Sequence, residues 1–367
     1  MLVCASCKCL FSETKNTFIQ NIKNPISKIW EVINNRNEGI GLNAASRTCG
    51  VTKNTIISWE NKFLNIYKVL FLYAITHCYL QLTVEGDEFY TKIKQNLPSD
   101  QSTGWTIVLM DRESRFIWEL SCGQKDRSLF RKAIKKIEKL INQTQDFKLI
   151  TDGERRYGNV LFEICYELIK DGKPGRPKKT LKKGIQVRIK NKGSQAHKKG
   201  RKRPKYQAPC PEHPETKQEI ENKDIHANHV EANNSAMRRK CSSFRRTTNT
   251  YAKSTEGLQR ILNVYWVVHN FMRTHFTTKE VPAVAMYCRR SGIPQFWPVR
   301  KPADDYFGRT SAESASHLNE PGCRSPLSGQ TGPDIGQRTQ KNGAGPPGPQ
   351  RWYFADLLVL SSIARAS

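Results

Sequence analysis

The order of strand and helix patterns between residues 80 and 170 limits the possible folds more than any other feature of the chain. LTVEGDEFYTKI reads as a strand, and WTIVLMDRESRFIWEL predicts two strands joined by a tight turn at Asp111–Ser114. From Asp126 to Ile141 the apolar residues share one helical face, opposite Lys and Arg: Leu129, Phe130, Ala133, Ile134, Ile137 and Leu140. A short buried strand, FKLIT, stops at Asp152, and a helix is expected from Tyr157 to Ile169. This series predicts an α/β domain with a mixed sheet flanked by helices.

Acidic residues stand at the ends of the first and fourth of these strands, and a third acid stands on a later helix. Asp87 and Asp152 are the strand residues, and Glu231 lies in the first turns of the helix predicted from DIHANHVEANNSAMRRKCSSF. Three carboxylates that converge from separate elements can hold two Mg²⁺ or Mn²⁺ ions about 3.5–4 Å apart, as metal-dependent phosphoryl transfer requires. This order of elements and acids is typical of a ribonuclease H-like core. Asp87, Asp152 and Glu231 are therefore the candidate catalytic and metal-binding residues. Three nearby acids rank below them: Glu88, Asp111 and Glu154.

A large positive charge indicates a polyanionic partner. Lys and Arg number 60 against 33 Asp and Glu, which gives a formal net charge of +27. Because such a charge repels itself in the compact state, nucleic acid is the first candidate partner. An anionic membrane is the second candidate, and a ribosomal or histone-like scaffold is the third.

The cysteines and the apolar segments favour a cytoplasmic protein. The 11 cysteines are an odd number and mostly scattered, which fits a reducing cytosol better than a disulfide framework. The first residues, MLVCASCKCLF, lack the pattern of a signal peptide. The apolar stretch from Leu64 to Leu82 is too short and too polar to span a bilayer, so a buried helix is expected there.

The segment AASRTCGVTKNTIISWENKF has the spacing of a helix-turn-helix. Gly50 stands at the expected turn, and Ile56 and Trp59 lie on the second helix. Short helix pairs of this kind also arise by chance, but the strong positive charge favours a DNA-binding reading. The side chains expected to face the major groove are Thr52, Lys53, Asn54 and Ser58.

A basic run from residue 172 to 206 contains fifteen Lys or Arg and no acid. Such a run contacts phosphates without reading sequence, and its binding weakens steeply with salt. Within it GKPGRPKK resembles an AT-hook, whose Arg176 would enter a narrow minor groove. The alternative is a solvated, disordered loop, and disorder in the free protein is compatible with contact to DNA. The other candidate DNA contacts, from this run and from the Glu231 helix, are Lys198, Lys199, Arg201, Lys202, Arg203, Asn234 and Arg238.

Three further metal or catalytic motifs are weaker. Cys4 and Cys7 form a CxxC pair, but a zinc ribbon usually needs two such pairs, so zinc is not expected here. His226 and His229 stand at i, i+3 without a second pair at zinc spacing, and lining the Glu231 helix is the simpler reading. Tyr251 could serve a tyrosine recombinase only with an Arg-His-Arg constellation, which the sequence does not reveal.

Several blocks of the chain are similar to the insertion-sequence-one family of transposases: LTVEGDEFYTKI, GWTIVLMDRESRFIWEL, LITDGERRYGNVLFEICYELI, KNKGSQAHKKGRKRPKYQAP, DIHANHVEANNS, RRTTNTYAK and LQRILNVYWVVHNF. The resemblance implies a DDE-type DNA transposase whose three acids are Asp87, Asp152 and Glu231. It implies double-stranded DNA as partner, as element terminal repeats and as target, with a homo-dimer or larger assembly on the DNA. No ATP is expected, since no phosphate-cradling Gly-rich Lys loop is present.

These observations divide the chain into four parts. A truncated zinc-ribbon-like segment (1–25) and a helix-turn-helix region (26–65) precede the ribonuclease H-like domain (80–285), which carries the basic insertion (172–206). The remainder (287–367) is rich in Gly and Pro, departs from the family pattern and is expected to be disordered. A frameshift or read-through would explain this departure.

Two alternative functions remain open from the sequence. One is a catalytically defective DNA-binding relic or repressor of the same element, which would have no use for three carboxylates. The other is a structure-specific nuclease, which would share the metal site but cut without joining.

Overall fold

The computed structural model describes residues 2–3, 6–11, 17–77, 83–95, 97–98, 100–144, 147–170, 172, 175–189, 210–211, 226–245 and 249–291. All of them belong to one compact unit, and a second unit, Trp297–Gln350, lies outside the described residues. The tail expected to be disordered (287–367) begins with the last five residues of helix α8 (Pro282–Ser291), so the expectation is wrong there; from residue 292 onward it lies outside the described residues. Six of the candidate site residues also lie outside: Cys4, Lys198, Lys199, Arg201, Lys202 and Arg203.

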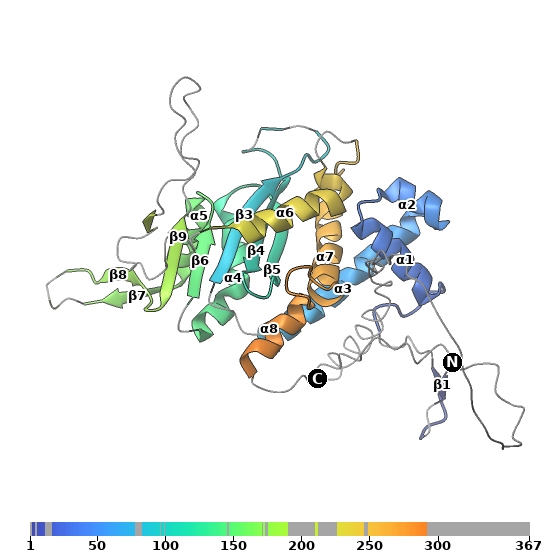
Figure 1. Cartoon of the computed structure of the whole chain (residues 1–367), viewed down its shortest axis with the longest axis horizontal. Coiled ribbons are helices and arrows are strands. Elements are labelled where there is room, and N and C mark those ends of the chain that lie inside the picture. Colours follow the sequence, from blue (N-terminus) through green and yellow to red (C-terminus); the bar gives the residue numbers. More distant parts are fainter. Residues whose placement is uncertain are drawn as a thin grey trace, which may run out of the picture. The chain divides into compact units, whose positions relative to one another are not determined.

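A mixed sheet forms the centre of the described unit (Figure 1). Its five main strands are β3 (Thr83–Tyr90), β4 (Trp105–Asp111), β5 (Ile117–Gly123), β6 (Phe147–Thr151) and β9 (Ile185–Ile189). They lie in the order β9-β6-β3-β4-β5, and the two-residue β10 (Cys210–Pro211) pairs with β9 at the edge. β3 is parallel to β6 and antiparallel to β4, while β9 is parallel to β6. The expectation of an α/β fold with a mixed sheet is confirmed.

Helices cover both faces of this sheet. α4 (Arg127–Gln143) and α5 (Arg155–Ile164) lie on one face, and α6 (Asn228–Lys240) and α7 (Thr255–Phe271) lie on the other. Neighbouring residues of β3 show the two sides, because Gly86 faces Tyr157 of α5 while Asp87 bonds Asn234 of α6. α8 (Pro282–Ser291) follows and packs on α7.

The local sequence explains where these elements begin and turn. The Asp126 side chain accepts a hydrogen bond from Leu129 N at 2.9 Å, which caps α4. The predicted apolar face of α4 is buried throughout, so this helix prediction is confirmed. Between β4 and β5, the Asp111 carboxylate accepts from Ser114 N (2.8 Å) and from Ser114 Oγ (2.6 Å). This side chain therefore closes the turn expected at Asp111–Ser114.

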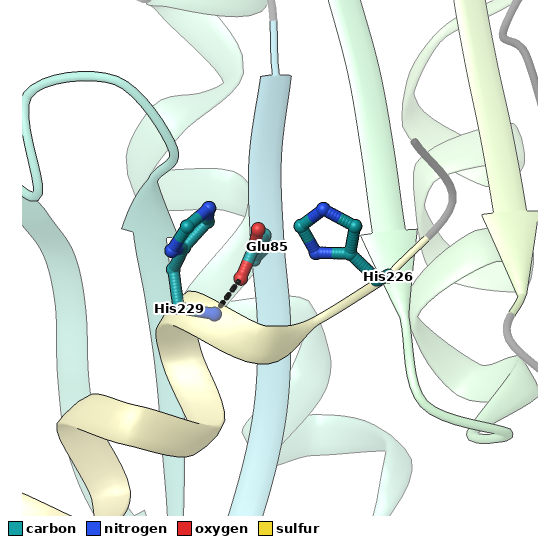
Figure 2. Close-up of side chains that lie close together, drawn as sticks. All are labelled: Glu85, His226 and His229. Atoms are coloured by element: carbon teal, nitrogen blue, oxygen red, sulfur yellow. Dashed lines mark hydrogen bonds between the residues drawn. The ribbon is translucent and has the colours of Figure 1, made fainter. Parts of the chain in front are cut away.

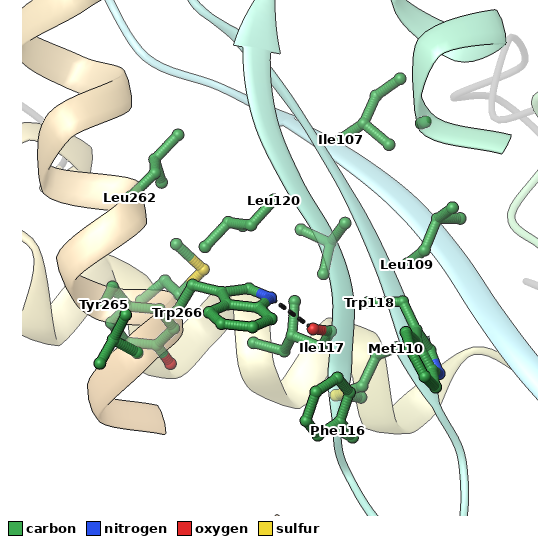
Figure 3. Close-up of a cluster of buried hydrophobic side chains, with 14 of the residues drawn as sticks. Ile107, Leu109, Met110, Phe116, Ile117, Trp118, Leu120, Leu262, Tyr265 and Trp266 are labelled. Atoms are coloured by element: carbon green, nitrogen blue, oxygen red, sulfur yellow. Dashed lines mark hydrogen bonds between the residues drawn. The ribbon is translucent and has the colours of Figure 1, made fainter. Parts of the chain in front are cut away.

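α7 is anchored to β5 by polar bonds inside an apolar cluster (Figure 3). Trp266 Nε1 donates to Ile117 O at 2.6 Å. The Asn270 side chain also bonds Ile117, donating to its carbonyl and accepting from its amide, each at 2.9 Å. Buried backbone groups of the edge strand are thereby satisfied by side chains. The expected packing of the last helix against the sheet is confirmed: Tyr265, Trp266, Val268 and Phe271 are all buried.

His269, on the same helix, should make the fold sensitive to acid. Burial lowers the pKa of His269 to about 3, and its Nε2 bonds Arg115 O at 2.9 Å. The unfolded chain takes up this proton below roughly pH 6.5, so stability should fall as pH drops from about 6.5 to 3, by at most ~1.4 kcal/mol per pH unit. Urea unfolding across this range should show a shallower pH dependence in His269→Phe. If the unfolding free energy of His269→Phe depended on pH as steeply as that of the wild type, His269 would not be a source of the acid sensitivity.

Three helices precede the sheet. α1 (Ile26–Asn37) and α2 (Leu42–Cys49) are followed by Gly50, whose φ of 62° ends α2 in the left-handed conformation. α3 (Lys53–His77) then runs without interruption for 25 residues through residue 65, where a domain boundary was expected. Its second half packs on the sheet domain, and the Tyr67 ring centroid lies 4.7 Å from that of Trp266. Among the described residues, no helix combines the length and apolarity needed to cross a membrane.

Two segments differ from the sequence-based expectation. The helix predicted over residues 157–169 ends at Ile164, and β7 (Tyr166–Ile169) pairs with β8 (Lys178–Leu181) in a separate hairpin. The basic run 172–206, expected to be an inserted loop, contributes β9 to the sheet, beside β6. Apolar residues at alternate positions of β9 meet the core, with Ile185 6% and Val187 0% exposed. The remaining short elements are β1 (Leu2–Val3), β2 (Leu10–Phe11) and a 3-10 turn, Ser242–Phe244.

A valine in β9 tests whether this part of the basic run belongs to the core. Val187→Ala removes two methyl groups from a fully buried position and should lower the free energy of unfolding by about 2 kcal/mol. Lys183→Ala, at an exposed position just before the strand, should change it by less than ~0.5 kcal/mol. Urea denaturation measures both. If both substitutions changed the free energy of unfolding by the same negligible amount, residues 185–189 would not belong to the core and a solvated loop would be the better description.

Candidate carboxylate site

Asp87 and Asp152 lie next to each other on two neighbouring parallel strands, although Asp87 lies within β3 (Thr83–Tyr90) and not at its end as expected. β3 and β6 are in register from Thr83↔Lys148 to Gly86↔Thr151, so Asp87 and Asp152 are the next two positions. Adjacent residues of parallel strands present their side chains to the same face. The structure therefore places two carboxylates side by side on one face of the sheet, at the point where β6 ends.

The surroundings of Asp87 disfavour its ionised form. Burial, together with the charges of Glu88 and Asp152, raises the pKa of Asp87 to about 7. Two hydrogen bonds to the carboxylate act in the opposite direction, from Glu88 N to Oδ1 at 2.9 Å and from Asn234 Nδ2 to Oδ2 at 2.7 Å. A carboxylate held in place beside other acids is the electrostatic setting that a divalent cation relieves.

α6 supplies the third acid. Asn234 is only 2% exposed and bonds Asp87, which fixes this face of α6 against β3. Glu231 lies one turn earlier and so shares the face with Asn234, while Glu231 itself is half-buried. The burial of Asn234 and its bond to Asp87 give it a place inside the carboxylate cluster, which differs from the DNA contact expected from the sequence.

Close packing behind Asp87 supports its backbone. A Cβ atom at Gly86 would lie 3.3 Å from side-chain atoms of Leu109 and Thr151 and 3.4 Å from Tyr157 Cε1. The small residue at this position allows Tyr157 to approach, and the Tyr157 hydroxyl donates to Asp87 O at 3.0 Å. α5 thus restrains this part of β3 from the face opposite to α6.

A buried glutamate positions the start of α6 (Figure 2). Glu85 is 0% exposed, and its Oε2 accepts from His229 N (3.0 Å) and Val230 N (2.9 Å) in the first turn of the helix. Its Oε1 accepts from Arg112 Nε at 2.7 Å, and Arg112 also donates to His226 O. An anionic group at a helix N-terminus satisfies unpaired amides and interacts favourably with the helix dipole. Glu85 therefore sets the position of Glu231, which directly follows His229 and Val230 on α6.

The same glutamate lies between two imidazoles, but the setting is unfavourable for a cation. Ligand atoms of Glu85, His226 and His229 lie within 4.8 Å of one another (Figure 2). Burial and the charges of Arg115 and Arg112 lower the pKa of His229 to about 4, so positive groups already surround this point. Both Glu85 oxygens are also committed to Arg112 and to α6. We assign this cluster to the anchoring of α6.

Glu85→Gln tests the anchoring role. Glutamine has one carbonyl oxygen, so its NH₂ group must face either Arg112 or the two α6 amides, which are all donors. We expect Mn²⁺ affinity to fall by roughly 10- to 100-fold with the fold retained, as is typical when a group that orients ligands is changed. The matched control is Glu163→Gln, which changes a half-buried partner of the exposed Arg127 and Arg131. Equal behaviour of the two variants would refute the role of Glu85.

The nearby acids that ranked lower have structural partners. Lys125 Nζ lies 2.6 Å from Glu88 Oε1 and 3.3 Å from Glu154 Oε2. Glu154 also caps α5 by accepting from Arg156 N at 3.1 Å. Asp111 is 0% exposed and closes the β4–β5 turn. These contacts account for the three residues without a role in metal binding.

The other candidate residues are spread over the chain. Thr52, Lys53, Asn54 and Ser58 are exposed at the start of α3, as a recognition helix requires. Arg176 is exposed between β7 and β8, and Arg238 is half-buried, with its guanidinium carbon 5.6 Å from the centre of the Phe89 ring. Cys7 is exposed.

Sequence reasoning missed the groups that hold the site together. Glu85 shares the strand face of Asp87, two residues earlier, and this periodicity was a usable signal. Lys125 and Tyr157 stand in segments whose patterns predicted only a loop and a helix. Nothing in their local sequence indicates a contact with β3.

Neither a protein-family model nor a curated protein matches the chain. The assignment of the site therefore depends on its own geometry. The residues suit divalent metal ions, because the donors are hard carboxylate oxygens and because the charges of Glu88 and Asp152 contribute to the raised pKa of Asp87.

Proposed function

We propose that the chain is a DDE-type DNA transposase that cleaves DNA at element ends and joins the freed 3′-OH to target DNA. The observation that carries this proposal is the convergence of Asp87, Asp152 and the Glu231 face of α6. The strand order β9-β6-β3-β4-β5, with β4 antiparallel to its neighbours, supports a ribonuclease H-like identity for the domain.

The residues of the site divide into metal ligands and residues that orient them in this proposal. Asp87, Asp152 and Glu231 would hold two Mg²⁺ or Mn²⁺ ions, which activate the attacking oxygen and stabilise the leaving oxygen. Asn234 orients Asp87 through its 2.7 Å bond, and Glu85 orients Glu231 through the first turn of α6. The side chains thus supply geometry and negative charge, and no proton shuttle from a histidine is required.

The remaining parts fit a protein that acts on double-stranded DNA. The helix pair α2–α3 presents Thr52, Lys53, Asn54 and Ser58 at an exposed helix start, which suits the major groove. The net charge of +27 favours a polyanionic substrate. Because two element ends must be handled together, a homo-dimer or larger assembly on DNA in the cytoplasm is part of the proposal. ATP is not.

Cleavage and joining assays on DNA with the flanking element ends test the proposal. In Mg²⁺ or Mn²⁺ we expect nicked and joined products, which should disappear in Asp152→Asn. Cutting without joining would favour a structure-specific nuclease. Binding without cutting, by a chain shown to be folded, would favour a relic or repressor.

A further inference from the structure

The β7–β8 hairpin has features that the carboxylate site does not use. β7 and β8 pair antiparallel from Tyr166↔Leu181 to Ile169↔Lys178 and form a two-stranded sheet of their own (Figure 1). All four residues of β7 are exposed. The hairpin is therefore a ribbon with little cover from the rest of the described chain.

Positive charge is concentrated on this ribbon. Among its described residues, from 166 to 183, Glu167 is the single acid. Against it stand six exposed basic residues: Lys170, Arg176, Lys178, Lys179, Lys182 and Lys183. A surface with this balance attracts a polyanion and repels a second copy of itself.

Apolar side chains are exposed between the charges. Tyr166, Leu168 and Ile169 are 36%, 57% and 42% exposed. Leu168 is paired across the ribbon with Lys179, and Lys179 Nζ lies 4.3 Å from the centre of the Tyr166 ring. A surface that combines cations with apolar groups matches a duplex, which offers phosphates together with sugars and thymine methyl groups.

We propose that the β7–β8 hairpin is a second DNA-binding element, separate from the helix-turn-helix. Lys178 and Lys179 contact phosphates, and Arg176, in the connection between the strands, enters the minor groove, where narrow A·T-rich DNA has the most negative potential. This inference deepens the proposed function and depends on it, since a DNA-joining enzyme must hold the duplex beside the cleavage site. Its ligand is double-stranded DNA with an A·T-rich minor groove.

Anisotropy titrations of the full chain with short duplexes in EDTA measure binding without cleavage. Lys178→Gln/Lys179→Gln should reduce the slope of log K against log[salt] by about 1.8, and should weaken binding by roughly tenfold near 0.15 M salt. The matched control is Arg127→Gln/Arg131→Gln, which removes two exposed cations from α4. Arg176→Gln should reduce the preference for A·T-rich over G·C-rich duplexes. Equal thermal midpoints in all variants establish that the fold is intact.

An unchanged salt slope in the double lysine variant, or an equal loss in the α4 control, would overturn the proposal. A second result would also overturn it. If Leu168→Ser/Ile169→Thr changed the molecular mass measured by sedimentation but left DNA binding unaltered, the ribbon would be a protein interface. The two proposals fail separately. A chain that binds DNA through the hairpin but never cuts would refute only the transposase, and one that cuts and joins with hairpin-independent binding would refute only the hairpin.

Discussion

Asp87→Asn should lower DNA cleavage by at least ~10³-fold, about 4 kcal/mol of transition-state stabilisation. The substitution keeps the shape and one oxygen acceptor for Asn234 Nδ2, but it removes the charge that would hold a metal ion and places an amide NH₂ in front of Glu88 N. Because burial, Glu88 and Asp152 raise the pKa of Asp87 to about 7, the ionised carboxylate is unfavourable in the folded protein. In EDTA at pH 8 the gain from removing this charge should exceed the roughly 1–3 kcal/mol cost of leaving Glu88 N without its acceptor, so Asp87→Asn should be at least as stable as the wild type.

The combination of lost activity and retained stability is the signature of a residue selected for chemistry. Cleavage rates and urea unfolding should be measured on the same preparations. Asp100→Asn, at an exposed position, serves as the matched control and should change neither quantity. Cleavage by Asp87→Asn within tenfold of the wild type would remove Asp87 from the metal site.

Glu60→Ala should destabilise the fold by about 3–5 kcal/mol, because it would leave two guanidinium groups without their shared carboxylate. Glu60 is 1% exposed and lies on α3. Its Oε1 lies 2.8 Å from Arg36 Nε of α1, and its Oε2 lies 2.9 Å from Arg260 Nε of α7. One buried carboxylate thus joins three helices.

Urea unfolding measures this effect, and Glu31→Ala is the control. Glu31 forms an exposed i, i+3 pair with Lys28 at 3.0 Å, and its loss should cost less than ~0.5 kcal/mol. A loss below about 1 kcal/mol in Glu60→Ala would mean that the buried network does not bridge the helices.

The Glu60 network has a functional consequence. α3 begins with the residues proposed to read DNA and continues as one helix to the contact between Tyr67 and Trp266. The network and this contact tie α1 and α3 to α7, which packs on β5, a strand of the same sheet as β3 and Asp87. We therefore expect DNA held by the start of α3 to be placed in a defined orientation to that sheet.

Sequence patterns succeeded where the interactions are local. The apolar face of α4 repeats every three to four residues, and its capping Asp126 stands directly before it. The β4–β5 turn needs only Asp111 and Ser114, three positions apart. Asp152 was expected directly after a buried strand, and it follows β6 (Phe147–Thr151).

The same patterns failed where a long-range partner decides. YELI can continue a helix or form a strand, and only its pairing with Lys178–Leu181 makes it β7. IQVRI lies in a basic run that resembles a loop, yet β6 binds it through five register pairs because that edge of the sheet is open to it. The role of Asn234 depends on Asp87, 147 residues away.

By itself the sequence determined the class of the fold, the order of its central elements and the position of Asp152 directly after a buried strand. These properties follow from side-chain periodicity and capping, which act over a few residues. Only the tertiary structure decided that β9 completes the sheet, that Glu85 anchors α6 and that Glu60 joins three helices. Each of these depends on a buried polar group or strand edge that can be satisfied only by a partner far away in the chain.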